Sequence, residues 1–120
     1  MERAVSFADG RGSPRELIAR LGEGWTGEET LAIALYCSLR AKSFEDGVLL
    51  AVNHGGDSDS TGSVAGNLLG LIHGAAAIPR RWLDRLELRG LIEELGLDLW
   101  RHFGEGADAL APEDGARYPA

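Results

Sequence analysis

The chain has 120 residues, 44% apolar and 26% charged, which argues against wholesale disorder and fits one globular domain with a core. Its net charge of -7 argues against general binding to nucleic acid or to an anionic membrane, because both need clustered Lys and Arg. The single cysteine, Cys37, cannot form an internal disulfide, and no apolar run suggests a signal peptide or a membrane span. We therefore expect a cytoplasmic protein.

Helix signals dominate the chain, although residues 1–12 are expected to form a loose N-terminal segment. Residues 13–16, Ser-Pro-Arg-Glu, combine a capping box with proline at the first helical position, and they predict a helix that ends near Gly22. Residues 26–29, Thr-Gly-Glu-Glu, form a second capping box and predict a helix that extends to about Ala41.

Four further helices are predicted over about residues 43–52, 60–73, 79–86 and 88–103. The apolar residues expected on one face of the first are Phe44, Val48, Leu49 and Val52, and those carried by the third are Trp82, Leu83 and Leu86. The apolar face of the last helix is formed by Leu88, Leu91, Ile92, Leu95, Leu99 and Phe103. The residues expected to face water on that helix are Arg89, Glu93, Glu94, Asp98 and Arg101.

The glycine- and proline-rich residues 104–120 are predicted to form a flexible tail. No segment shows the alternating pattern of a strand. We therefore predict an all-α, bundle-like domain over residues 13–103, with about five or six helices.

The most informative segment is the loop at residues 53–60, Asn-His-Gly-Gly-Asp-Ser-Asp-Ser, which holds no apolar side chain. Asp57 and Asp59 lie two positions apart with Ser60 beside them, and such oxygen ligands suit hard cations such as Mg²⁺, Mn²⁺ and Ca²⁺. Flanking glycines let the backbone turn sharply, and the helix that follows directs free amides at the loop.

The same loop could also be a helix cap or an EF-hand. Asp57 or Asp59 could simply cap the following helix, but a cap takes one carboxylate and the loop supplies two. An EF-hand is rejected, because its twelfth loop position, which should be a Glu, is Leu68. Metal binding and capping therefore both stay open.

A ladder of glycines follows the loop, at positions 62, 66, 70 and 74. On a helix these residues form one bare stripe, which lets another helix approach closely. An interior helical glycine otherwise costs about 1 kcal/mol against alanine. We therefore expect tight helix packing that holds the loop rigid.

Residues 53–70, N-H-G-G-D-S-D-S-T-G-S-V-A-G-N-L-L-G, resemble the second metal motif of the ADP-ribosylglycohydrolases, which include the dinitrogenase reductase-activating glycohydrolases. Both flanks are similar to the family as well, at residues 21–32 before the motif and residues 78–89 after it. The resemblance covers roughly residues 17–100, which is most of the predicted globular part.

The resemblance implies an all-α enzyme that binds two Mg²⁺ or Mn²⁺ ions and hydrolyses the bond between ADP-ribose and a protein side chain or small acceptor. It implies that Asp57, Asp59 and the Ser60 hydroxyl are metal ligands, with both aspartates counted as catalytic. The metals would hold the ribose hydroxyls and help to activate water. Gly55, Gly56 and His54 are then candidates for contact with ADP-ribose or the ADP-ribosylated substrate.

The chain also departs from the family. Complete members are longer, and their N-terminal half carries another metal motif, a Ser or Thr followed by two acidic residues, which is not found here. The resemblance therefore implies a site that needs a missing half, supplied by a longer chain, a companion chain or a homo-oligomer. The alternative is a non-catalytic helical module that keeps the fold and works by binding a partner.

Overall fold

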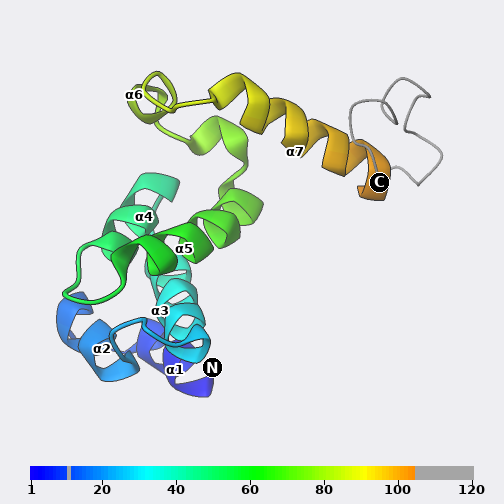
Figure 1. Cartoon of the computed structure of the whole chain (residues 1–120). Helices are drawn as coiled ribbons and strands as arrows, with labels where there is room; N and C mark the ends of the chain where they lie inside the picture. The colour runs from blue at the N-terminus through cyan, green and yellow to red at the C-terminus, as the bar shows by residue number, and fades with distance from the viewer. Residues whose placement is uncertain (11, 105–120) are drawn as a thin grey trace. The chain divides into compact units, whose positions relative to one another are not determined.

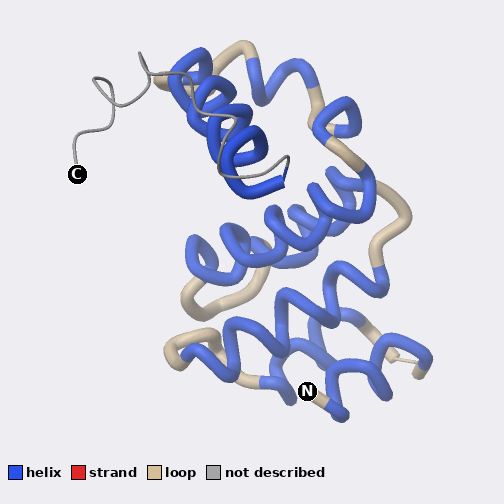
Figure 2. The backbone as a smooth tube through the Cα atoms, turned by 90° about the vertical axis from the view of Figure 1, so that its right-hand side faces the viewer, coloured by secondary structure: helices blue, strands red, loops and turns tan. Residues whose placement is uncertain are grey.

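The computed structural model describes residues 1–10 and 12–104, and every regular element in that part of the chain is helical (Figures 1 and 2). The chain divides into two units, residues 1–80 and 81–120. The first unit contains α1 (Glu2–Asp9), α2 (Pro14–Leu21), α3 (Gly27–Arg40), α4 (Phe44–Val52), α5 (Ser58–His73) and the 3-10 helix η1 (Ala75–Ala77). The short α6 (Arg80–Leu83) spans the boundary, and α7 (Arg89–Gly104) lies in the second unit. The prediction of an all-α fold is confirmed, whereas residues 105–120 of the predicted tail lie outside the described residues.

Helix α3 forms the centre of the first unit, where it packs against α1, α2, α4 and α5. Its side chains Ile33, Tyr36 and Cys37 are fully buried. Helix α5 lies beside α3 and α4 (Figure 1) and buries Thr61, Ala65 and Leu69, which are spaced four apart and so share one face. This packing places the start of α5, where the candidate loop ends, against the core.

The start signals for three helices are confirmed, because each depends on a short stretch of sequence. Helices α2, α3 and α4 begin directly after Ser13, Thr26 and Ser43. The Thr26 hydroxyl accepts the Glu29 amide at 3.4 Å and the Ser43 hydroxyl accepts the Asp46 amide at 3.2 Å, whereas Ser13 forms no cap hydrogen bond. No helix was predicted before Ser13, yet α1 forms there and packs against α3.

Several details of the prediction are wrong. Helix α5 begins at Ser58 instead of Ser60, because Asp57 is its N-cap residue. The helix expected from Pro79 ends at Leu83, so that Leu86 lies beyond it. Asp98, expected to face water on α7, is buried and forms an ion pair with Arg101 at 3.4 Å.

The buried face of α4 also differs from the predicted one. It is formed by Phe44, Gly47 and Ala51, whereas Leu49, expected beside Phe44, is exposed. The close approach of α4 to α5 occurs at Gly47, where a Cβ would lie 2.6 Å from a methyl carbon of Leu69.

The glycine ladder of α5 does not have the predicted packing role along its length. A Cβ at Gly62 would lie 2.6 Å from Val52, but a Cβ at Gly66 or Gly70 would meet nothing within 4 Å. The reason is that α5 buries the residues one position before these glycines. The glycines themselves therefore lie beside the packed face and not at its centre. No helix of the described residues is long and apolar enough for a membrane crossing.

Candidate functional site

The candidate loop connects α4 to α5 and lies against the connection between α2 and α3, to which its backbone is hydrogen-bonded. The backbone N–H of Asp57 donates to the carbonyl oxygen of Glu23 at 2.7 Å. Gly56 approaches the same peptide so closely that a Cβ there would overlap the Glu23 carbonyl oxygen. Two segments that are distant in the sequence therefore interlock through their backbones, and only glycine fits at position 56.

Asp57, Asp59 and Ser60 converge at the N-terminus of α5. The carboxylate of Asp57 caps the helix by accepting the Ser60 amide at 3.4 Å, which confirms the capping interpretation for this residue. Hydrogen bonds from the Ser60 hydroxyl and with the Asp59 carboxyl hold the pKa of Asp57 below its usual value. The arrangement thus places two carboxyl groups and one hydroxyl at the start of α5, on the lining of one groove.

These three residues line an open groove of about 660 Å³. One wall is formed by residues 24–27, 30 and 31, and the other by residues 57, 59, 60, 63 and 64. Trp25 is 67% exposed on the first wall, and its indole N–H donates to a Glu23 carboxylate oxygen at 3.1 Å. Small-molecule sites typically enclose roughly 300–1,000 Å³, so the groove can admit a ligand of that size. Trp25 could not be predicted as a site residue, since only its exposure in the folded chain distinguishes it from a core tryptophan.

His54, Gly55 and Gly56 lie on the lining of a different cavity, of about 260 Å³, together with residues of α2. His54 Nδ1 accepts the Gly56 amide at 3.1 Å, and Nε2 lies 2.8 Å from the Thr61 hydroxyl. The structure therefore brings the predicted metal ligands together in the groove, and it places the predicted substrate-contacting residues in the second cavity.

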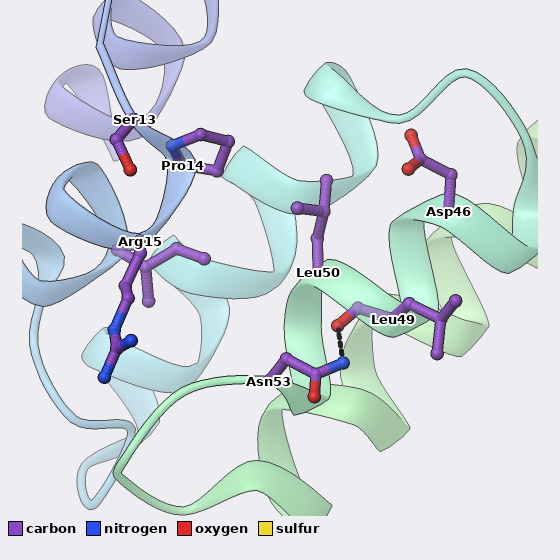
Figure 3. Close-up of a pocket in the computed structure, with 8 residues that line it drawn as sticks. Ser13, Pro14, Arg15, Asp46, Leu49, Leu50 and Asn53 are labelled. Carbon is purple, nitrogen blue, oxygen red and sulfur yellow. Dashed lines mark hydrogen bonds between the residues drawn. The ribbon is translucent and has the colours of Figure 1, made fainter.

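A third cavity, of about 360 Å³, lies between α2 and α4 (Figure 3). Arg15 and Asp46 stand on opposite sides of it, and the Asn53 side-chain amide donates to the Leu49 carbonyl oxygen at 2.7 Å. None of the residues predicted for metal or substrate binding lines this cavity.

The ligand set for a metal is partial in the part of the chain that the structure describes. No group of three or more His, Cys, Asp or Glu side chains there is arranged to hold a metal ion. Asp57, Asp59 and Ser60 nevertheless supply the oxygen donors that Mg²⁺ and Mn²⁺ prefer, at the start of α5. They fit one side of a hard-cation site whose remaining ligands must come from elsewhere.

Comparison with known proteins gives several relatives. The chain is 35% identical to the ADP-ribosylarginine hydrolase Tri1 of Serratia proteamaculans, over 60% of the chain and 20% of the relative. It is 34% identical to the ADP-ribosyl-[dinitrogen reductase] glycohydrolase of Rhodospirillum rubrum, over 51% of the chain and 21% of the relative. It is 26% identical to the mouse ADP-ribosylhydrolase ARH3, over 79% of the chain and 29% of the relative.

The chain thus spans less than a third of each of these relatives. No solved structure matches it. The family model described as ADP-ribosylglycohydrolase matches residues 1–109, which include every element that the structure describes. The chain belongs to the ADP-ribosylglycohydrolase family.

Proposed function

We propose that this chain supplies one side of the active site of a metal-dependent hydrolase that cleaves the glycosidic bond between ADP-ribose and a protein side chain or small acceptor. The observation that carries the proposal is the convergence of Asp57, Asp59 and Ser60 on the wall of a groove of ligand size. Relatives named ADP-ribosylarginine hydrolase and ADP-ribosyl-[dinitrogen reductase] glycohydrolase support this class of substrate.

Each of the three residues has a role in this proposal. Asp57 and Asp59 are ligands of Mg²⁺ or Mn²⁺, and the Ser60 hydroxyl is a further oxygen ligand. The bound metal supplies Lewis acidity, which orients the ribose hydroxyls and lowers the pKa of a water molecule. The lowered pKa of Asp57 extends to lower pH the range in which its carboxyl group is ionised and can bind a cation.

The groove itself offers the substrate two kinds of surface. Trp25 presents a broad exposed ring on one wall, and the N-terminus of α5 presents backbone amides on the other. Contact through His54, Gly55 and Gly56 would require the substrate to extend around the loop into the second cavity.

The remaining ligands and much of the substrate pocket come, in this proposal, from the rest of a longer polypeptide, a companion chain or a second copy. The short span relative to the known relatives supports this view. A non-catalytic binding module is the second candidate function, because only two carboxyl groups meet at the site within the described residues.

Calorimetric titration with Mn²⁺ and Mg²⁺ tests the proposal, with ADP-ribose absent and then present. We expect binding to the wild type and at least about tenfold weaker binding to Asp59→Ala, since loss of even an outer-shell partner costs that much. Asp9→Ala removes one carboxylate from an exposed position at the end of α1 and serves as the matched control.

Two outcomes would contradict the proposal in different ways. Equal binding to the wild type and Asp59→Ala would place any metal elsewhere on the chain. No binding at millimolar metal would contradict the expectation that Asp57, Asp59 and Ser60 hold a metal before the rest of the site is supplied, and would favour the binding module.

A further inference from the structure

We propose that Glu29 is a positioning residue for the candidate site, because its carboxylate fixes residues 23–25 and, through them, Asp57. Glu29 is not on the lining of the groove, so its influence on a ligand must pass through other residues. The relevance of this role to metal binding rests on the proposed function, whereas the role itself concerns the metal-free chain.

Three backbone amides donate hydrogen bonds to the carboxylate of Glu29. Its Oε2 atom accepts the amides of Glu23, Gly24 and Trp25 at 3.4, 3.1 and 3.2 Å. Successive backbone amides that converge on one anion form a nest, and charge strengthens each of these hydrogen bonds. In an ordinary capping box this carboxylate would accept a hydrogen bond from the amide of the N-cap residue, Thr26. Here it accepts hydrogen bonds from the amides of the three residues before Thr26.

Glycines before and within the nest make this arrangement possible. Gly24 has a φ of +86°, a conformation that residues with a Cβ rarely adopt. A Cβ at Gly22 would lie 2.5 Å from the carboxyl carbon of Glu29, so that only glycine lets this side chain pass. The local sequence Gly-Glu-Gly-Trp is therefore shaped around the carboxylate of Glu29.

A further hydrogen bond connects the nest to the candidate metal ligand Asp57. The Glu23 carbonyl oxygen accepts the Asp57 amide at 2.7 Å. The Gly24 carbonyl oxygen accepts the buried Thr30 hydroxyl at 2.7 Å, which ties the same segment to α3. Trp25 lies on one wall of the groove and Asp57 on the other. The Glu29 carboxylate therefore fixes the backbone of the first wall directly and that of the second through Glu23.

Amide hydrogen exchange measured by NMR on the metal-free chain tests the role directly. We expect Glu29→Ala to speed exchange at Gly24, Trp25 and Asp57 by about tenfold or more, which corresponds to the loss of a hydrogen bond to a charged group. Exchange at Leu69, in the core of α5, should not change. Glu28→Ala removes the exposed neighbouring carboxylate and should leave all four amides as in the wild type.

A conservative variant and a metal titration complete the test. Glu29→Gln keeps one acceptor oxygen and should restore part of the protection at Asp57, and it carries the test if Glu29→Ala does not fold. Mn²⁺ affinity should fall in Glu29→Ala in proportion to the fraction of molecules in which the segment around Asp57 is no longer ordered, with Glu28→Ala unchanged.

Unchanged Asp57 exchange in both Glu29 variants would overturn the proposal, as would unchanged Mn²⁺ affinity in a variant whose Asp57 amide exchanges as fast as in an unstructured chain. Absence of Mn²⁺ binding to the wild type would instead contradict the proposed function. In that case the exchange rates alone still decide whether Glu29 positions Asp57.

Discussion

His54 joins the candidate loop to α5 through both nitrogens of its ring. The Thr61 hydroxyl has one proton, and its shortest contact with a carbonyl oxygen is to Ala51 at 2.7 Å, so it accepts a hydrogen bond from His54 Nε2–H. His54 Nδ1 is then the acceptor for the Gly56 amide. A substrate could contact either nitrogen only by displacing one of these hydrogen bonds, which makes support of the loop the role that the geometry favours.

Cys37 offers a test of the core at the level of a single side chain. Its thiol is fully buried in α3, and burial raises its pKa to about 12. The unfolded thiol has a pKa of about 8.5, so the associated stability is fully present below that pH and decreases as the pH rises towards 12. We expect Ellman's reagent at pH 8 to modify Cys37 only as fast as the chain unfolds, with the guanidinium-unfolded chain as control. Rapid modification of the native chain would contradict this burial.

Individual site residues were predictable only where they are contiguous in the sequence. Asp57, Asp59 and Ser60 lie within one short motif, and all three line the same groove in the structure. Glu23 acts through a hydrogen bond to a loop that the fold brings to it, whereas Glu29 ends the capping box at residues 26–29 but accepts amides that precede that box. The sequence carried one hint, the capping box at Thr26, but this motif normally has a purely local role.

At the level of elements, predictions based on local chemistry were more successful than those that depend on a packing partner. The N-caps at Thr26 and Ser43 were correct because they require only the neighbouring amides. The bare stripe of α5 was misjudged because the sequence shows that glycines share a face, but not which face meets α3 and α4.

The two kinds of glycine on α5 should respond differently to a methyl group. Gly66→Ala places its Cβ in open space, so we expect the free energy of unfolding to rise by about 0.5–1 kcal/mol from helix propensity. Gly62→Ala directs its Cβ at the branched side chain of Val52, and this crowding should cancel or reverse the gain. Urea unfolding of both variants measures the difference. An equal effect at the two positions would show that the stripe is packed differently.

At the level of the whole molecule, the apolar core belongs to one unit. Every buried apolar residue of the described chain lies between Ala4 and Leu69. We therefore expect a fragment of residues 1–80 to unfold in a single cooperative transition, followed by circular dichroism on heating, with the full chain as reference. A broad, non-cooperative transition of the fragment would show that residues 81–120 are needed for folding.

The family and the all-α class could be predicted for the whole molecule, since both depend on a long motif and on helix signals repeated along the chain. The division into two units could not be predicted. Helical periodicity is similar in α5 and α7, and it does not show which helices share a core.

The backbone hydrogen bond between Glu23 and Asp57 has a consequence for protein design. The Gly-Gly-Asp-Ser-Asp-Ser segment owes its shape to a second segment that supplies a carbonyl oxygen and the surface on which Gly56 rests. Grafting residues 53–62 alone onto another helical scaffold would transfer the carboxylates without the template that orients them. A transplantable unit must contain residues 22–30 as well, held at the same distance by helices equivalent to α3 and α5.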